Sequence, residues 1–401
     1  MKKIIILLFF VFSSFLSFSS HFMGGEITWK CLKGGANIGK YIFEMKVYRD
    51  CSGTTFAQSA ETVTHHNYPV VGGTTPILMN FISTSTQATP IGSSGSGNAC
   101  FDCANGDEGA VEELIWRSDP MTLAGNAPVE GWHFTWGDCC RSSDITNGMA
   151  DDFWTLRAVM YPYIDPVIGV LPASPCYDSS PVFKELAKTI ICIDYPFSYS
   201  HNASDDELDQ ITYSWEEPLG DDFAYDPNNP NATALIFSAP YTVTAPIPGN
   251  PTLDSITGEI AYNSSTAGLF VTCVKVEAKK CDQIVAEIYR EVLVTLLNCS
   301  GFNQPTDGLN DPPIVTSPIG PQFWVNTAAA GNLPTYRTEV RAGEIVTFTI
   351  QAEDLDLYPG GVLQDITLDI SGGQVSFDYQ NPALCPNPPC ATFNDGENPP
   401  I

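Results

Sequence analysis

Glycine and proline interrupt this chain so often that long helices are disfavoured as its main element. The 401 residues include 32 Gly and 31 Pro, nearly as many as the 46 Asp+Glu and 18 Lys+Arg together. Both residue types mark turns, and runs of aromatic and β-branched residues lie between them. We therefore predict an all-β fold of many short strands joined by turns.

The strand signals are strongest in five runs. Residues 41–48, 130–136 and 153–160 are rich in aromatic and β-branched side chains. Residues 268–277 and 284–297 are longer apolar runs joined by a short polar connection, which predicts a terminal hairpin. Together these runs predict β-sandwich modules.

The first residues predict export. Met1-Lys2-Lys3 is a basic head, and residues 4–18 are an apolar run broken only by serines and followed by small residues. This is the pattern of a secretory signal peptide, assigned to residues 1–19. The apolar run has about 15 residues, fewer than a membrane-spanning helix needs, and no later run is long enough. We expect a secreted or extracellular cell-surface protein without a transmembrane segment.

The charge of the chain limits its partners. The formal net charge is −28 and the isoelectric point is about 4.2. Such a chain is repelled by the phosphates of nucleic acids and by anionic lipid headgroups. We expect no nucleic-acid partner, and cations are the more natural ligands.

Thirteen cysteines in an exported chain predict disulfide bonds. Because the number is odd, one thiol stays free or pairs outside this segment. Zinc bound by Cys100, Cys103, Cys139 and Cys140 is the alternative, but adjacent cysteines chelate a metal poorly, so disulfides are favoured. The disulfide candidates are Cys31, Cys51, Cys100, Cys103, Cys139, Cys140, Cys176, Cys192, Cys273, Cys281, Cys299, Cys385 and Cys390.

Composition predicts three modules after the signal peptide. We expect an N-terminal β-sandwich over 20–176, a second sandwich over 177–300, a polar linker over 301–311 and a truncated repeat of the second sandwich over 312–401. The linker is rich in Pro, Gly and polar residues.

The repeat is inferred from an internal alignment. Residues 197–205 align with residues 346–354, and an acidic cluster follows each. The chain ends on Pro399-Pro400-Ile401 in the middle of the third unit, so we expect the N-terminal portion of a longer protein.

The acidic clusters are the candidate metal sites. Carboxylates at alternate positions of an extended segment lie on one side of it, where Ca²⁺ can collect several oxygens. The alternative is a solvated turn, because Asp is common in turns. The candidate Ca²⁺ ligands are Asp205, Glu207 and Asp209 in one cluster and Asp354 and Asp356 in the other.

Catalytic signals are weak, and we expect a non-enzymatic protein. None of the standard hydrolase or nucleotide-binding motifs occurs, and adjacent carboxylates on a strand point to opposite faces. His65-His66 is interpreted as a surface turn rather than a metal site. Trp132 and Trp136 share one face of a strand, which suits a core or, less well, a platform for stacking sugars.

Several short segments occur together in this chain. They are Ser20-His-Phe-Met-Gly-Gly-Glu-Ile-Thr-Trp29, Tyr48-Arg-Asp-Cys-Ser-Gly53, Gly137-Asp-Cys-Cys-Arg141, Ser179-Ser-Pro-Val-Phe183, Ala203 to Tyr213, and Tyr289-Arg290 before Cys299. As a set they resemble the N-terminal region of gliding-motility-associated surface proteins of Bacteroidota that carry a type B sorting domain. The resemblance covers nearly the whole mature chain. In place of the family's Asp-Pro-Asp-Gly-Asp stands Asp205-Asp-Glu-Leu-Asp209, and no sorting domain lies within these residues.

The resemblance implies tandem immunoglobulin-like, PKD-like or cadherin-like modules displayed outside the cell. It also implies the type IX secretion machinery as a partner, with an extracellular surface or glycan as the contact. We expect a structural or adhesion protein, with Ca²⁺ as its only candidate cofactor. The alternative is a carbohydrate-binding accessory module of a larger secreted enzyme that degrades polysaccharides.

Overall fold

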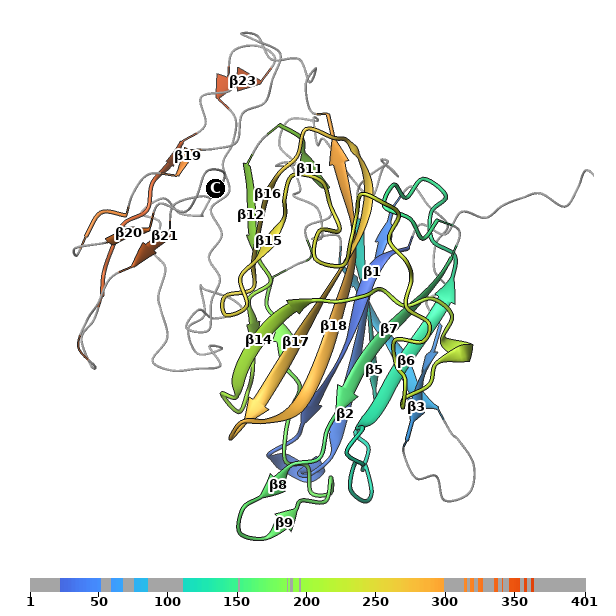
Figure 1. Cartoon of the computed structure of the whole chain (residues 1–401). Helices are drawn as coiled ribbons and strands as arrows, with labels where there is room; N and C mark the ends of the chain where they lie inside the picture. Colours follow the sequence, from blue (N-terminus) through green and yellow to red (C-terminus); the bar gives the residue numbers. More distant parts are fainter. Residues whose placement is uncertain are drawn as a thin grey trace, which may run out of the picture.

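The computed structural model confirms the all-β prediction. It describes residues 22–51, 59–67, 76–85, 111–150, 152–185, 187, 190–194 and 196–298, together with short segments between 314 and 363. Helical structure in these residues is limited to the single turns η1 (Gly35–Asn37) and η3 (Asp222–Ala224). Large antiparallel sheets form the rest of the regular structure, as Figure 1 shows.

Eight strands form a closed ring in which every neighbouring pair is antiparallel. The order around the ring is β1-β2-β5-β4-β3-β6-β7-β18, and β18 also pairs with β1. The bounds are β1 (Phe22–Cys31), β2 (Tyr41–Asp50), β3 (Glu61–His66), β4 (Ile77–Ser85), β5 (Val111–Ser118), β6 (Trp132–Cys139), β7 (Phe153–Met160) and β18 (Gln283–Leu297). Buried aromatic side chains from different strands meet inside the ring, with the Phe43 and Phe134 ring centroids 4.6 Å apart.

Further strands extend this sheet on one side. β17 (Gly268–Lys280) pairs with β18, β14 (Gln210–Trp215) pairs with β17, and β11 (Ile190–Cys192) runs parallel to β18. The predicted terminal hairpin is therefore present as β17 and β18. Its connection is shorter than expected, because only Cys281 and Asp282 remain unpaired, both with the positive φ of a tight two-residue turn.

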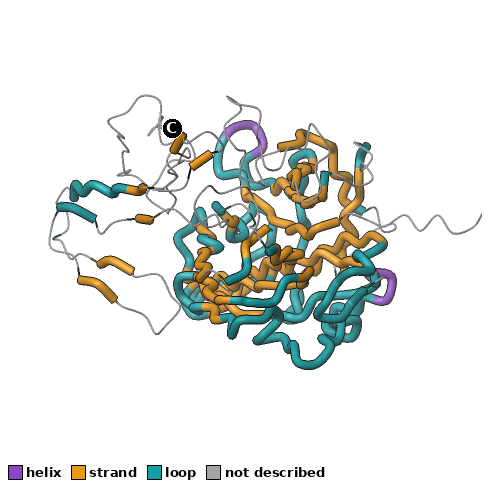
Figure 2. Tube along the Cα trace, turned by 90° about the horizontal axis from the view of Figure 1, so that it is seen from above, coloured by secondary structure: helices purple, strands orange, loops and turns teal. Residues whose placement is uncertain are grey.

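Smaller strand pairs complete the body seen in Figures 1 and 2. A three-stranded sheet packs against β17 and β18, and two short pairs lie elsewhere in the body. The bounds are β12 (Pro196–Ser200), β16 (Glu259–Asn263) and β15 (Thr252–Leu253) in the small sheet, β10 (Val182–Phe183) with β13 (Ala203–Ser204), and β8 (Ile164–Asp165) with β9 (Gly169–Val170). Seen from above, loops cover the strands along one side (Figure 2).

The ring corrects the boundary expected between 20–176 and 177–300. β18 hydrogen-bonds to β1 and to β7, so both regions belong to one sheet. Gly24 makes the closure feasible, because it pairs with Tyr48 of β2 and with Val292 of β18. Its φ is +126°, and a Cβ there would overlap the backbone carbonyl of Glu291. Only glycine allows so close an approach.

Short pairs between 314 and 363 include one that matches the body. β10 pairs with β13 so that Phe183 faces Ala203, and β19 (Ile314–Val315) pairs with β22 (Ala352–Glu353) so that Val315 faces Ala352. Both pairs are antiparallel and have the same register relative to the aligned alanines. The other two pairs are β20 (Trp324–Asn326) with β21 (Thr335–Arg337), and β23 (Leu357–Tyr358) with β24 (Val362–Leu363). Residues 301–311, the expected linker, lie outside the described residues.

Two disulfides have both partners in the described residues. Cys31–Cys176 ties the end of β1 to the segment before β10, and Cys139 bonds its neighbour Cys140. Cys139 and Cys140 are thus bonded to each other and are not thiolates for the zinc alternative. Cys51 and Cys192 are also disulfide-bonded, whereas Cys273 (buried) and Cys281 (exposed) are free. The candidates outside the described residues are Cys100, Cys103, Cys299, Cys385 and Cys390.

Candidate functional site

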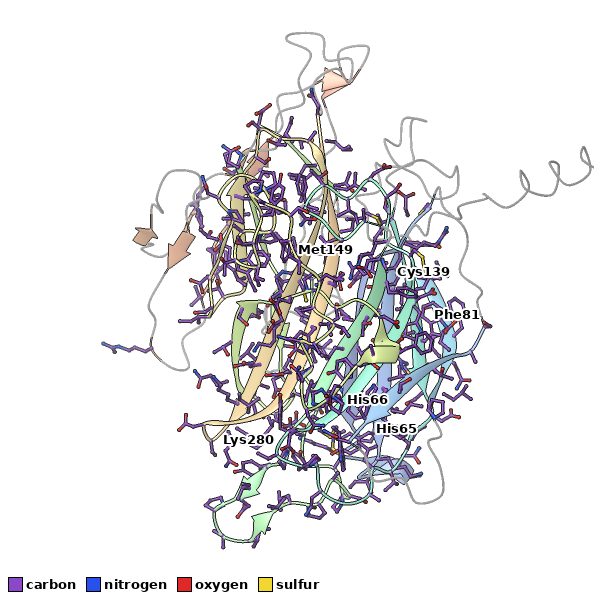
Figure 3. All side chains as sticks on the ribbon, turned by 45° about the vertical axis from the view of Figure 1, so that its right-hand side comes forward. His65, His66, Phe81, Cys139, Met149 and Lys280 are labelled. Carbon is purple, nitrogen blue, oxygen red and sulfur yellow. A yellow bond between two sulfur atoms is a disulfide. The ribbon has the colours of Figure 1, made fainter. Side chains whose placement is uncertain are left out.

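The predicted acidic cluster lies where three segments meet. They are the segment 176–180, the turn 205–209 between β13 and β14, and Lys280 at the end of β17. Because β14 pairs with β17, with Gln210 opposite Lys279, Asp209 lies beside Lys280. Figure 3 shows Lys280 at the end of the long hairpin.

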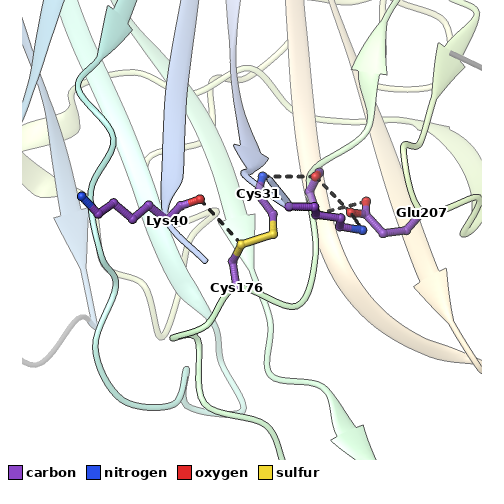
Figure 4. The surroundings of a disulfide bond; sticks show 6 residues. Cys31, Lys40, Cys176 and Glu207 are labelled. Atoms are coloured by element: carbon purple, nitrogen blue, oxygen red, sulfur yellow. Dashed lines mark hydrogen bonds and ion pairs between the residues drawn. A yellow bond between two sulfur atoms is a disulfide. The ribbon is translucent and has the colours of Figure 1, made fainter. Parts of the chain in front are cut away.

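The segment 176–180 is fixed against β1. Ser179 Oγ accepts a hydrogen bond from the Cys31 amide at 3.1 Å, and Ser180 Oγ accepts one from the Trp29 amide at 2.9 Å. The Cys31–Cys176 disulfide holds the start of the same segment, as Figure 4 shows. The backbone at Asp178 is therefore held from both sides.

Asp178 and Asp209 share one cation. Lys280 Nζ lies 3.0 Å from Asp178 Oδ1 and 2.6 Å from Asp209 Oδ2. The Asp178 side chain is 1% exposed, and its burial raises its pKa to about 8, although the Lys280 charge opposes this rise. Burial would lower the pKa of Lys280, but the two carboxylates raise it above its usual value.

Asp205 stabilises the acidic turn itself. Its Oδ1 accepts hydrogen bonds from the amides of Glu207 at 2.9 Å and Asp209 at 3.0 Å. Leu208 between them has a positive φ of 62°. Burial raises the pKa of Asp205 to about 6, and the nearby carboxylates of Asp209 and Glu207 add to the rise. The sequence analysis gave a solvated turn as the alternative to a Ca²⁺ site. The turn is present, but Asp205 is buried in it.

Glu207 has partners of its own, separate from those of Asp209. Its carboxylate accepts hydrogen bonds from the amide and hydroxyl of Ser179, both at 3.1 Å, and forms an ion pair with Lys33 (Figure 4). Among the described residues, no group of three or more His, Cys, Asp and Glu side chains converges as a metal site would require. Asp354 and Asp356 lie outside that part of the chain. Calcium binding therefore stays a prediction.

A second polar cluster lies where β1, β2 and β18 of the ring meet β10. Glu26 of β1 and Arg290 of β18 form an ion pair in which each side chain is 1% exposed. Tyr48 donates a hydrogen bond to Glu26 at 3.1 Å, and the Arg290 guanidinium lies 3.9 Å from the Phe183 ring centroid. Burial alone would raise the pKa of Glu26, but the charge of Arg290 helps to hold it below its usual value.

A third cluster uses the neighbouring residue of β18. Glu291 pairs with Arg141, whose side chain is fully buried. Arg141 also donates hydrogen bonds to the carbonyls of Phe153 at 2.8 Å and Leu219 at 3.0 Å, and it stacks over Trp154. Sequence reasoning noted the segments that contain these residues but did not assign the ion pairs. The available signal was a pair of adjacent opposite charges in the middle of a mostly apolar strand.

The other candidate residues serve the fold. Trp132 is fully buried and Trp136 is 5% exposed, so both belong to the core and neither forms a sugar platform. His65 and His66 lie on strand β3, not in a surface turn, and His66 Nε2 lies 2.8 Å from the hydroxyl of Thr135. The strand continues through them because β3 pairs there with β6.

A small apolar pocket of about 30 Å³ lies between the small sheet and β17–β18. Phe197, Tyr199, Trp215 and Tyr262 line it together with His201, whose two ring nitrogens have no hydrogen-bond partner within the described residues. No helix in that part of the chain is long and apolar enough to cross a membrane. Comparison with protein families, curated proteins and solved structures finds no match to this chain.

Proposed function

We propose that this chain is a secreted, non-enzymatic, modular protein of the bacterial cell surface with a structural or adhesive role. The observation that carries the proposal is the repeated strand pairing. β10 with β13 and β19 with β22 have the same register in two successive parts of the chain. Tandem repeats of one β-unit are the usual construction of extended surface stalks, and immunoglobulin-like, PKD-like or cadherin-like modules would suit this role.

The links within the body support a structural role. The closing strand β18 pairs with β1, β7 and β17, and the Cys31–Cys176 disulfide fastens the end of β1. These links make the body one unit, which suits a structural role. Export by the type IX machinery and contact with an extracellular surface or glycan remain part of the proposal, and they rest on the resemblance of the sequence.

The test is made on intact bacterial cells. An antibody raised against the folded chain should label unpermeabilised cells, and the label should disappear after surface proteolysis. A strain without the gene should attach less well to surfaces while its growth on polysaccharides is unchanged. Normal attachment combined with a loss of polysaccharide binding or degradation would overturn the proposal and favour the accessory module. Because Trp132 is buried, its replacement would test folding rather than sugar stacking.

A further inference from the structure

The contact between Lys280 and Asp178 brings an amine to a buried carboxyl group. Lys280 Nζ lies 3.0 Å from Asp178 Oδ1 and 2.6 Å from Asp209 Oδ2. We propose that Lys280 and Asp178 become joined by an intramolecular isopeptide bond, with Asp209 as the catalytic group that accepts the proton. This covalent self-modification is separate from the proposed surface role, and either can hold without the other.

The nucleophile is held in place by the sheet. Lys280 is the last residue of β17, and Asp209 directly precedes β14, which is paired with β17. The Lys280 side chain is 20% exposed and the Asp209 side chain 9%. Both groups therefore stay in contact while the hairpin is folded, and the effective concentration of the amine at the carboxyl group is high.

The electrophile is a carboxyl group in an environment that favours its neutral form. The Asp178 side chain is 1% exposed, and its Oδ2 accepts no hydrogen bond from the described residues. Burial raises its pKa to about 8, and the carboxylates of Asp205 and Asp209 add to the rise. At neutral pH a neutral carboxylic acid is thus available, which a nucleophile attacks far more readily than a carboxylate.

The reaction balances without an added reagent. The Asp209 carboxylate takes a proton from Lys280, and the free amine attacks Cγ of Asp178. Asp209 returns this proton to a hydroxyl group of the tetrahedral intermediate, which leaves as water. Asp209 then takes the second proton from the new amide nitrogen and releases it to solvent. One C–N bond forms, one C–O bond breaks, and one water molecule leaves, with no change in oxidation state.

The raised pKa of Lys280 slows this reaction, because the amine is mostly protonated. The modification needs to occur only once in the life of each molecule, and the reacting groups are held together throughout. A low fraction of free amine is therefore sufficient.

The experiment measures mass on the full chain. After reduction of the disulfides, the protein should be about 18 Da lighter than its sequence requires, which is the mass of one water molecule. Peptide mapping should find the Asp178 peptide linked to the Lys280 peptide. The Lys280→Arg variant keeps the positive charge but cannot form the amide, so it should show the full mass and linear peptides. The matched control is Lys279→Arg, which should keep the link.

Two further variants separate the roles. Asp209→Asn should leave the peptides linear or slow the linkage strongly, because the proton acceptor is lost. Asp178→Asn should react with loss of ammonia, so the mass should fall by about 17 Da instead of 18. If the Asp178 and Lys280 peptides are linear in the protein without substitutions, the proposal is overturned whatever the variants do. The contact is then an ion pair only.

Discussion

Replacing Glu26 by Gln tests whether water is excluded from the buried ion pair that Glu26 forms with Arg290. The substitution keeps the shape of the side chain and removes its charge, so Arg290 is left buried without a counter-ion. Breaking such a pair costs about 3–5 kcal/mol of folding free energy, because the remaining charge is removed from water and has no opposite charge beside it. Arg290 keeps its hydrogen bonds to the Glu185 carbonyl at 2.8 Å and to the Tyr199 hydroxyl at 3.2 Å. These contacts offset part of the loss, so we expect about 3 kcal/mol.

The assay is urea unfolding of both proteins at pH 7, followed by tryptophan fluorescence. Glu44→Gln is the matched control, because Glu44 pairs with Arg117, whose side chain is 47% exposed. An exposed pair of this kind contributes less than about 1 kcal/mol. The double variant Glu26→Gln with Arg290→Met should lose less than the sum of the two single variants. A loss for Glu26→Gln as small as that of the control would refute the reasoning, since water would then reach the pair.

Three further predictions concern other parts of the body. Burial holds the pKa of His201 well below 6.5, so the unfolded chain binds a proton that the folded chain does not. Stability should therefore fall by up to about 1.4 kcal/mol per unit as the pH drops below about 6.5, and His201→Phe should reduce this slope in urea unfolding at pH 5 to 8. Replacing Cys31 and Cys176 by Ser opens a loop with a sequence separation of 145. The unfolded chain then gains entropy worth at most about 5 kcal/mol, which calorimetry should record as a lower Tm. Gly24→Ala should cost about 1–3 kcal/mol or more through overlap with β18, whereas Gly34→Ala, with open space around it, should change stability by less than about 0.5 kcal/mol.

Local patterns predicted the strands well but not how the ring closes. The run at 153–160 matches β7, and the two long runs match β17 and β18, because strands buried on both faces form continuous apolar runs. The pairing of β1 with β18 joins residues far apart in the chain, with Glu26 and Arg290 separated by 264 positions. Nothing in a local pattern selects a partner at that distance. The boundary between 20–176 and 177–300 failed for this reason.

The candidate site was predicted in part. The acidic turn was found from residue types alone, since four of the five residues at 205–209 are Asp or Glu. Its partners were missed, because Lys280 was assigned to the short connection of the hairpin and no motif singled out Asp178. Only the pairing of β14 with β17 and the fixation of 176–180 on β1 bring them to the turn.

Two opposite charges stand side by side in β18, and each has its own counter-ion inside the body. Adjacent residues of a strand point to opposite faces, so Arg290 and Glu291 cannot neutralise each other. Arg290 faces Glu26 on one side of the sheet, and Glu291 faces Arg141 on the other. Each face therefore needs its own counter-ion from a distant strand or loop, and both are supplied. Because these buried pairs are balanced, they contribute nothing to the net charge of −28, which must come from the remaining side chains. An acidic surface of this kind makes neighbouring copies of the chain repel one another.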